Sequence, residues 1–232
     1  MSASNICIVI PAFNEAKRIG PVVEGARRHA VVVVVDDGSA DGTAEVAAGA
    51  GAVVLRQPVN QGKGAALAAG FAYAREHGFD AVITMDADGQ HAPSELPRFI
   101  AAFRAHRPAV VVGSRMDNLK DMPFVRRWTN IIMSWMLSRR MGQRVPDTQC
   151  GYRLYRQDVL PYLAVDAQRF AAESEVLLNL AARGFTIESV PVSTIYGDEK
   201  SKINPVVDTV RFFGMLRRHR VPRNTSSTSA TP

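Results

Sequence analysis

Val31–Thr43 reads VVVVVDDGSADGT, in which five consecutive valines run directly into two aspartates and a glycine-containing turn. A short run of β-branched residues without a polar residue is typical of a strand that is buried on both faces. Such strands occur mainly in parallel sheets that helices cover on both sides. The polar residues that follow mark the carboxyl end of the strand, where sheets of this kind bind ligands.

The same pattern recurs four more times in the first half of the chain. Apolar runs at 6–10, 52–55, 81–85 and 109–112 are each followed by polar or glycine-rich residues, and most of the intervening segments have helical spacing. Strands alternating with helices predict an α/β fold with a Rossmann-like, doubly wound and mainly parallel sheet. Turn chemistry alone explains any one of these loops, but five of them at the same edge favour a ligand site.

The composition is that of a globular protein and narrows the class of partner. The chain has 232 residues, 47% of them hydrophobic, and a formal net charge of +6, which favours phosphorylated ligands or an acidic membrane surface. No nucleic-acid recognition motif accompanies the charge, so we expect no nucleic acid partner. Cys7 and Cys150 form neither a zinc pattern nor a disulfide framework, which fits a reducing cytosol.

We predict one domain over residues 1–220, followed by a polar tail at 221–232 that is expected to be disordered. A nucleotide-binding half would occupy 1–115, and an acceptor-binding and membrane-facing half 116–220. The start of the chain lacks the features of a signal peptide, and no stretch approaches the ~20 apolar residues of a membrane span. We therefore expect a cytoplasmic protein that contacts the inner face of the cell membrane peripherally.

Asp86 and Asp88 lie one residue apart, directly after the apolar run at 81–85. Two neighbouring carboxylates repel each other unless a cation lies between them. Hard oxygen ligands suit Mg²⁺ or Mn²⁺, and Gln90 can add an amide oxygen. The loop therefore predicts a magnesium or manganese site that holds a diphosphate, whereas a loop histidine such as His91 is more often incidental.

Two further loops offer contacts to a nucleotide. Asp37 is placed to hydrogen-bond a ribose hydroxyl or a base edge, while Asp36 braces the turn and Asp41 caps the next helix. Gly62 and Lys63 precede a helix N-terminus, where backbone N–H groups favour anions. The spacing matches neither a P-loop nor a dinucleotide fingerprint, so a nucleotide contact and a plain loop-to-helix turn stay open there.

Five motifs together resemble the family-two glycosyltransferases of the GT-A fold. They are IVIPAFNE (8–15), VVVDDGSADGT (33–43), NQGKGAALAAG (60–70), MDADGQH (85–91) and GSR (113–115). With DTQCGYRLYR (147–156), the chain resembles the dolichyl- and polyprenyl-phosphate sugar transferases in particular. The resemblance implies metal-dependent, inverting transfer of a hexose from a UDP- or GDP-sugar to a polyprenyl phosphate. The Q-x-x-R-W motif of processive relatives is absent, so we expect no polymer synthesis.

The resemblance also implies roles for single residues. Arg115 and Arg153 match basic residues near the phosphates, and Asp37 matches the acid near the base and ribose. Lys200, Ser201 and Lys202 form a basic loop that can receive a lipid phosphate. The nucleotide, metal and phosphate contacts expected in all are Pro11, Phe13, Glu15, Asp37, Lys63, Asp86, Asp88, Gln90, Arg115, Arg153, Lys200, Ser201 and Lys202.

The acceptor decides whether a catalytic base is needed. A phosphate monoester is already anionic and needs no strong base, whereas a hydroxyl acceptor requires a carboxylate to take its proton. Asp147 is the first candidate for that base, and Glu173 and Glu175 follow it. Each of them can instead be a helix cap or an arginine partner. The candidate catalytic residues are Asp88, Asp147, Arg115 and Arg153.

The second half of the chain is basic and amphipathic. FVRRWTNIIMSWMLSRRMG (124–142) predicts a helix with Asn130, Ser134 and Ser138 on one face, and with tryptophans among its apolar residues. Paired arginines near both ends are typical of a helix that lies in the headgroup region of a membrane. A buried helix and a contact with a protein partner stay open, and the oligomeric state is undetermined.

Three other functions compete with transfer to a lipid phosphate. A glycosyltransferase can use a hydroxyl acceptor on another lipid or a small molecule. A sugar nucleotidyltransferase also uses a doubly wound sheet and Mg²⁺, but PAFNEAKR lacks the glycines of its usual first loop. A non-catalytic nucleotide-sugar-binding protein would not need Asp86, Asp88 and Gln90 intact.

Overall fold

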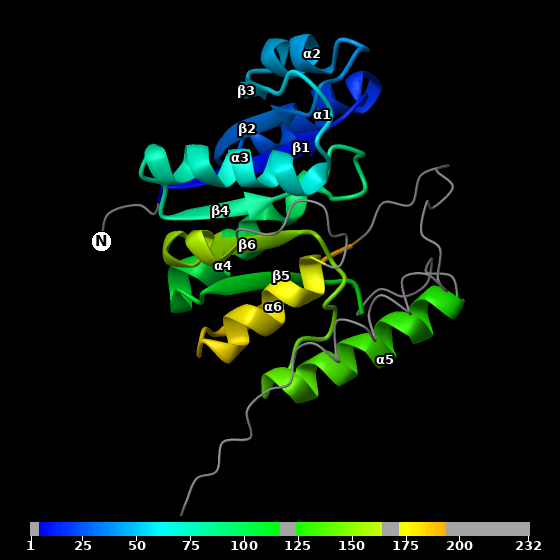
Figure 1. Cartoon of the computed structure of the whole chain (residues 1–232), viewed down its shortest axis with the longest axis vertical. Coiled ribbons are helices and arrows are strands. Elements are labelled where there is room, and N and C mark those ends of the chain that lie inside the picture. Colours follow the sequence, from blue (N-terminus) through cyan, green and yellow to red (C-terminus); the bar gives the residue numbers. More distant parts are fainter. Residues whose placement is uncertain (1–4, 117–123, 164–171, 194–232) are drawn as a thin grey trace, which may run out of the picture.

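The structure, a computed structural model, describes residues 5–116, 124–163 and 172–193 (Figure 1). The strands are β1 (Ile6–Ala12), β2 (Val31–Asp36), β3 (Val53–Arg56), β4 (Ala81–Thr84), β5 (Val110–Ser114), β6 (Arg153–Arg156) and β7 (Ile187–Pro191). The α-helices are α1 (Ala16–Ala26), α2 (Thr43–Gly49), α3 (Lys63–Glu76), α4 (Leu96–His106), α5 (Phe124–Met141) and α6 (Ala172–Ala182). The 3₁₀ helices are η1 (Pro93–Glu95) and η2 (Gln157–Leu163).

The strands form one mixed sheet in the order β3-β2-β1-β4-β6-β5-β7. Only β6 runs antiparallel to its neighbours β4 and β5, and the other pairs are parallel. The predicted mainly parallel α/β sheet is therefore confirmed. The five predicted strands are β1 to β5, and β6 and β7 were not predicted, because RLYR and IESVP contain no continuous apolar run.

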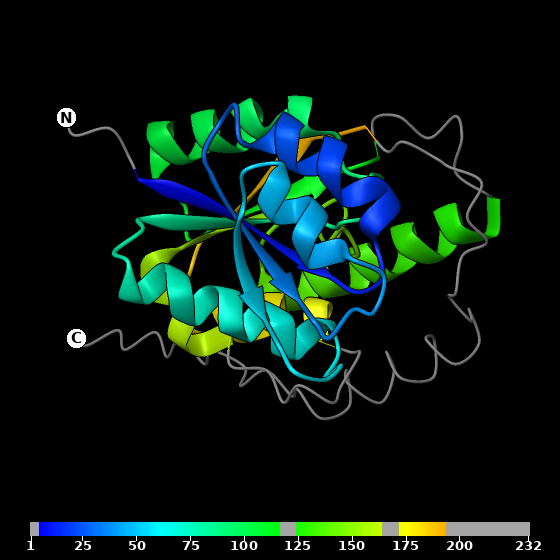
Figure 2. The same cartoon turned by 90° about the horizontal axis from the view of Figure 1, so that it is seen from above.

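Helices cover both faces of the sheet, with α1 and α4 on one side and α3 and α6 on the other (Figure 2). Two tyrosines show the division. Tyr155 of β6 packs edge-on against Phe71 of α3, whereas Tyr152, immediately before β6, packs against Phe99 of α4. The central valines of β2 are fully buried between these layers, which explains why the run VVVVV contains no polar residue.

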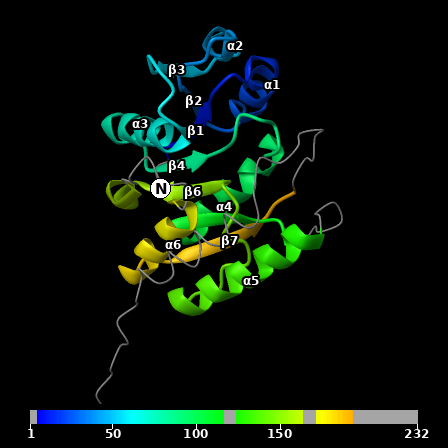
Figure 3. The same cartoon turned by 45° about the vertical axis from the view of Figure 1, so that its right-hand side comes forward.

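Helix α5 lies at the margin of the molecule, beyond β5 and β7 (Figure 3). Its predicted range of 124–142 agrees with the observed Phe124–Met141. Leu137 packs against Leu178 of α6 in a small apolar cluster that is separate from the main core. Among the described residues, none of the helices is both long and apolar enough to cross a bilayer.

The topology gathers the polar loops at one edge. Because β1, β2, β4 and β5 run in the same direction, the loops after them leave from the same end of the sheet. Backbone hydrogen bonds tie these loops together: the N–H of Asp37 donates to the carbonyl of Ala12 (2.9 Å), and the N–H of Met85 to that of Val9 (3.1 Å). This edge is where we look for the site.

Candidate functional site

The loop after β1 is joined to the loop after β2. The N–H of Asn14 donates to Ser39 Oγ (2.9 Å), and the N–H of Glu15 to Thr43 Oγ1 (2.8 Å). The ring of Phe13 remains exposed beside them. A flat apolar ring on a loop held in this way can stack against a base. Of the expected nucleotide-contacting residues, Phe13 and Glu15 lie in this loop, and Pro11 lies near the end of β1.

Asp41 links two helices and does not occupy the N-cap position that we predicted. The N-cap of α2 is Gly42. Asp41, one residue earlier, accepts from the N–H groups of Thr43 (3.1 Å) and of Ala16 in α1 (3.0 Å). Its role is structural, as expected, but it joins the starts of α1 and α2 instead of capping one of them.

Asp37, which is expected near the ribose and base of a nucleotide, is buried in this structure. It is 3% exposed, and its two carboxylate oxygens accept from the backbone N–H groups of Gln61 and Gly62 at 2.8 Å each. Asp36 braces its own turn by accepting from the N–H of Ser39, as predicted. Asp37 therefore holds the loop that precedes α3, and its contact with a nucleotide stays a prediction.

Lys63 begins α3 and reaches the loop after β4. Its Nζ lies 2.6 Å from Oδ1 of Asp86. Gly62, immediately before it, has φ +92°, which L side chains rarely adopt. Asp37, Gly62 and Lys63 thus form a chain of contacts from the end of β2 to the predicted metal ligand.

The charge of Asp86 is stabilised from several sides. Burial on its own raises the pKa of this carboxyl, but the positive charges of Lys63 and Arg115 and the hydrogen bond from Lys63 outweigh it and lower the pKa to about 2. His91 is buried, and its Nδ1 lies 3.0 Å from the backbone N–H of Asp86 and accepts from it. Burial lowers the pKa of His91, so the neutral ring braces the loop, stacked on Tyr152.

The residues of this loop suit a divalent ion. Asp86 and Asp88 offer carboxylate oxygens and Gln90 an amide oxygen, which is the hard donor set that Mg²⁺ and Mn²⁺ prefer. The ammonium of Lys63 on Asp86 shows that this oxygen already engages a cation. Asp88 also orders the loop, since its Oδ1 accepts from the N–H of Gln90 (2.9 Å). Within the described residues, no group of three His, Cys, Asp or Glu side chains forms a denser metal cluster.

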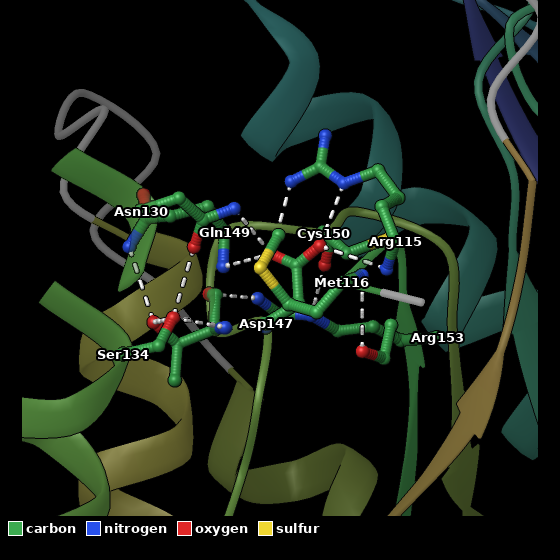
Figure 4. A network of polar contacts seen from close by, with 10 residues as sticks. Arg115, Met116, Asn130, Ser134, Asp147, Gln149, Cys150 and Arg153 are labelled. Atoms are coloured by element: carbon green, nitrogen blue, oxygen red, sulfur yellow. Dashed lines mark hydrogen bonds and ion pairs between the residues drawn. The ribbon is translucent and has the colours of Figure 1, made fainter. Parts of the chain in front are cut away.

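Arg115 follows β5 and pairs with Asp147 in two-point geometry (Figure 4). Its Nε lies 2.7 Å from Oδ2 of Asp147, and its Nη2 lies 2.9 Å from Oδ1. The positive charge of Arg115 also lowers the pKa of Asp86. Arg115 thus follows β5 at the same edge of the sheet as the loop of Asp86, and its contact with a phosphate stays a prediction.

Asp147 does not have the surroundings of a general base, which corrects our first candidate for that role. Its side chain is 0% exposed, and besides Arg115 it accepts from Asn130 Nδ2 (2.9 Å) and the N–H of Gln149 (3.2 Å). Burial raises its pKa, but the hydrogen bonds and charge of Arg115 outweigh this and lower it. A buried carboxylate with both oxygens engaged is an arginine partner, the alternative left open by the sequence.

Arg153, which the resemblance places near the phosphates, is also buried in this structure. It is 1% exposed, and its guanidinium donates to the carbonyls of Cys150 (2.7 Å) and Thr148 (2.9 Å) and to the hydroxyl of Tyr155 (3.2 Å). It lines a partly open pocket together with Lys63 and other residues of α3. Its guanidinium thus braces the loop that carries Asp147.

Several predicted residues lie outside the described part of the chain. Lys200, Ser201 and Lys202 do, and the side chain of Glu173 does as well. Glu175 is half-buried on α6. The assignment of an acceptor phosphate to the 200–202 loop therefore stays a prediction.

The structure adds one residue that sequence reasoning did not assign to the site. Asn130 of α5 contacts Asp147 (2.9 Å) and is itself held by Ser134, whose hydroxyl donates to Asn130 Oδ1 (2.9 Å). The four-residue spacing of Asn130, Ser134 and Ser138 predicted that they share one face of the helix. The sequence did not show which part of the protein this face contacts.

Comparison with known proteins agrees with the geometry. The sequence model of the family "Glycosyl transferase family 2" matches residues 7–163. A UDP-N-acetylglucosamine–dolichyl-phosphate N-acetylglucosaminyltransferase of Methanococcus voltae is 31% identical over 84% of this chain and 88% of its own length. An undecaprenyl-phosphate mannosyltransferase of Micrococcus luteus is 32% identical over 82% of this chain and 83% of its own length.

A solved structure shares the fold at much lower identity. Glucosyl-3-phosphoglycerate synthase from Mycobacterium tuberculosis, in complex with Mn²⁺, UDP and phosphoglyceric acid, is 19% identical. It superposes with a TM-score of 0.71 over 96% of this chain and 81% of its own. Because the family model matches residues 7–163 and these relatives are more than 30% identical, the chain belongs to glycosyl transferase family 2.

Proposed function

We propose that this glycosyltransferase moves a hexose, with inversion, from a UDP- or GDP-sugar to a polyprenyl phosphate. One observation carries the proposal: the loop with Asp86 and Asp88 shares the carboxyl edge of the sheet with Lys63 and Arg115. Two acids and two cations side by side suit a metal-bound diphosphate. The names of the relatives from Methanococcus and Micrococcus support a lipid-phosphate acceptor.

The side chains divide the chemistry between them. Asp86 and Asp88 would hold Mg²⁺ or Mn²⁺, which would supply positive charge to the diphosphate of the leaving nucleotide. Lys63, on Asp86 in this structure, would turn its ammonium towards the diphosphate. Arg115 offers donors in a fixed plane to the phosphates. The acceptor attacks the anomeric carbon from the face opposite the leaving group and so inverts it.

The surroundings of Asp147 favour a phosphate acceptor over a hydroxyl. A hydroxyl must lose a proton to a base during attack, whereas a phosphate monoester is already ionised. Asp147 is buried and bonded to Arg115. It is therefore poorly placed to act as the catalytic base that transfer to a hydroxyl acceptor would need. Glu173 and Glu175 remain for that alternative.

A direct assay tests the proposal. Purified protein is incubated with a panel of UDP- and GDP-sugars, Mn²⁺ and a short polyprenyl phosphate, and products are identified by mass spectrometry. We expect one donor to yield a glycosyl phosphoryl lipid and a free nucleoside diphosphate. Turnover on hydroxyl acceptors only would overturn the acceptor, and pyrophosphate release from a nucleoside triphosphate and a sugar phosphate would indicate a nucleotidyltransferase.

We propose also that α5 rests on an anionic membrane, at the cytoplasmic face where a lipid acceptor would lie. Trp128 and Trp135 are 50% and 59% exposed on this helix, next to exposed Phe124 and Ile132. These positions recur every three or four residues and so share one face. The guanidinium of Arg139 lies over the ring of Trp135, 5.4 Å from its centroid, which is the mixture of rings and cations found in interfacial helices.

Replacing both tryptophans of α5 by serine is expected to release the protein from vesicles. If each ring inserts about 100 Å² at ~25 cal/mol/Å², the pair contributes several kcal/mol, so the partition coefficient should fall at least about 100-fold. Sedimentation with phosphatidylglycerol-containing vesicles measures it. Val46→Ser with Val59→Ser is the matched control, since both valines are exposed but lie outside α5. Equal binding by all three proteins would refute the placement.

A further inference from the structure

A buried polar network joins α5 to the loop before β6 (Figure 4). Asn130, Ser134 and Ser138 lie four residues apart on one face of the helix, and all three bond to this loop. The hydroxyl of Ser134 donates to Asn130 Oδ1 and accepts from the N–H of Thr148, each at 2.9 Å. The hydroxyl of Ser138 donates to the carbonyl of Val145 and accepts from the N–H of the same residue.

Of these three side chains, only that of Asn130 contacts Asp147, the carboxylate that pairs with Arg115. Asn130 Nδ2 donates to Oδ1 of Asp147 (2.9 Å), the oxygen that also receives Nη2 of Arg115 (2.9 Å). Asn130 is fixed in turn by Ser134, so its amide has one orientation that satisfies both neighbours. Asp147 and Ser134 are essentially inaccessible to solvent, and a buried network of this kind holds its members rigidly.

We propose that Asn130 is a positioning residue that sets the plane of the Arg115 guanidinium through Asp147. The proposal rests on the function proposed above, in which Arg115 contacts phosphate. Arg115 bonds to both oxygens of Asp147, so a rotation of the carboxylate turns the guanidinium with it. The consequence is that α5, whose outer face carries Trp128 and Trp135, holds the site arginine with its inner face.

The first test compares two truncations on the same helix face. Asn130→Ala removes the amide from Asp147, and Ser138→Ala removes a partly buried hydrogen bond on the same face that does not reach Asp147. We expect Asn130→Ala to lower kcat by about 10- to 100-fold, since small misplacements of a binding group have effects of this size. The donor KM should stay within about twofold of the native value, and Ser138→Ala should keep the native kcat.

A mutant cycle separates positioning from simple destabilisation. In a background of Arg115→Ala with Asp147→Asn, the arginine is absent, so adding Asn130→Ala should leave the residual rate unchanged. An equal loss in both backgrounds would overturn the proposal. A higher acceptor KM with unchanged kcat would overturn it too, because it would show that Asn130 contacts the acceptor. Equal kcat losses in Asn130→Ala and Ser138→Ala would assign Asn130 to stability alone.

A spectroscopic readout does not depend on turnover or on the identity of the acceptor. In protein labelled with ¹⁵N-arginine, the Nε–H resonance of Arg115 is assigned by its loss in Arg115→Lys. We expect this Nε–H proton to exchange slowly with solvent in the native chain and in Ser138→Ala. In Asn130→Ala its resonance should broaden, or the proton should exchange rapidly with solvent. An unchanged resonance in Asn130→Ala would refute the positioning role even if the proposed function held, and a native chain inactive on every acceptor would leave this readout intact.

Discussion

Asp88→Asn is expected to lower sugar transfer at least about 1,000-fold, because a metal ligand on the diphosphate contributes several kcal/mol to the transition state. The fold should persist. Asparagine keeps the Oδ1 acceptor that receives the N–H of Gln90 (2.9 Å in the native chain) and loses only the negative charge. Binding of Mn²⁺ in the presence of UDP, followed by electron paramagnetic resonance, should weaken in parallel with kcat.

Glu76→Gln is the matched control for Asp88→Asn. It removes one exposed carboxylate from the far end of α3, the helix whose first residue is Lys63. Its kcat and Mn²⁺ affinity should equal those of the native chain. Normal turnover by Asp88→Asn would remove Asp88 from the metal site.

Arg115→Ala should damage both activity and stability, for two separable reasons. Loss of a preorganised phosphate donor lowers kcat by about 10²- to 10³-fold. The same change leaves Asp147 as a buried carboxylate without its cation, which costs about 3–5 kcal/mol and lowers Tm by about 10 °C. Adding Asp147→Asn removes the stranded charge, so the double variant should regain Tm without regaining kcat.

The pH dependence of Arg115→Ala follows from the pKa of Asp147. In the native chain that pKa is lowered by Arg115 against the effect of burial, so the pair contributes stability above the ordinary pKa of ~3.9 and loses it as the pH falls through that region. Without Arg115, burial dominates and the folded pKa rises above the unfolded one. The Tm deficit of the variant should therefore shrink as the pH is lowered from 8 to 5 in scanning calorimetry, and a constant deficit would contradict this account.

The sequence predicted the elements whose pattern is local. The valine run of β2 and the apolar runs of the four other strands fixed the parallel part of the sheet and the edge at which Asp86 and Lys63 meet. The mixed face of α5 predicted its range almost to the residue. Strand β6 was not predicted because two of the four residues in RLYR are charged. Its antiparallel position between β4 and β5 is decided by tertiary packing.

The surroundings of three candidate site residues could not be predicted from the sequence. Asp37 follows β2, Asp147 lies in the loop between α5 and β6, and Arg153 begins β6. Each is buried with its polar atoms bonded to protein. A single sequence shows the charge of a loop residue but not which backbone groups will surround it. In the structure Asp37 holds the loop before Lys63, and Asp147 pairs with Arg115. Contacts of Asp37 and Arg153 with a bound nucleotide or phosphate stay predictions.

The most direct measurement is a crystal structure of the protein soaked with MnCl₂ and UDP or GDP, with the anomalous signal of manganese recorded. The account predicts one Mn²⁺ in contact with Asp86 and Asp88, a diphosphate bridging to it, and the ammonium of Lys63 moved from Asp86 to a phosphate oxygen. Manganese or nucleotide bound elsewhere, with the 2.6 Å contact between Lys63 and Asp86 retained, would contradict it.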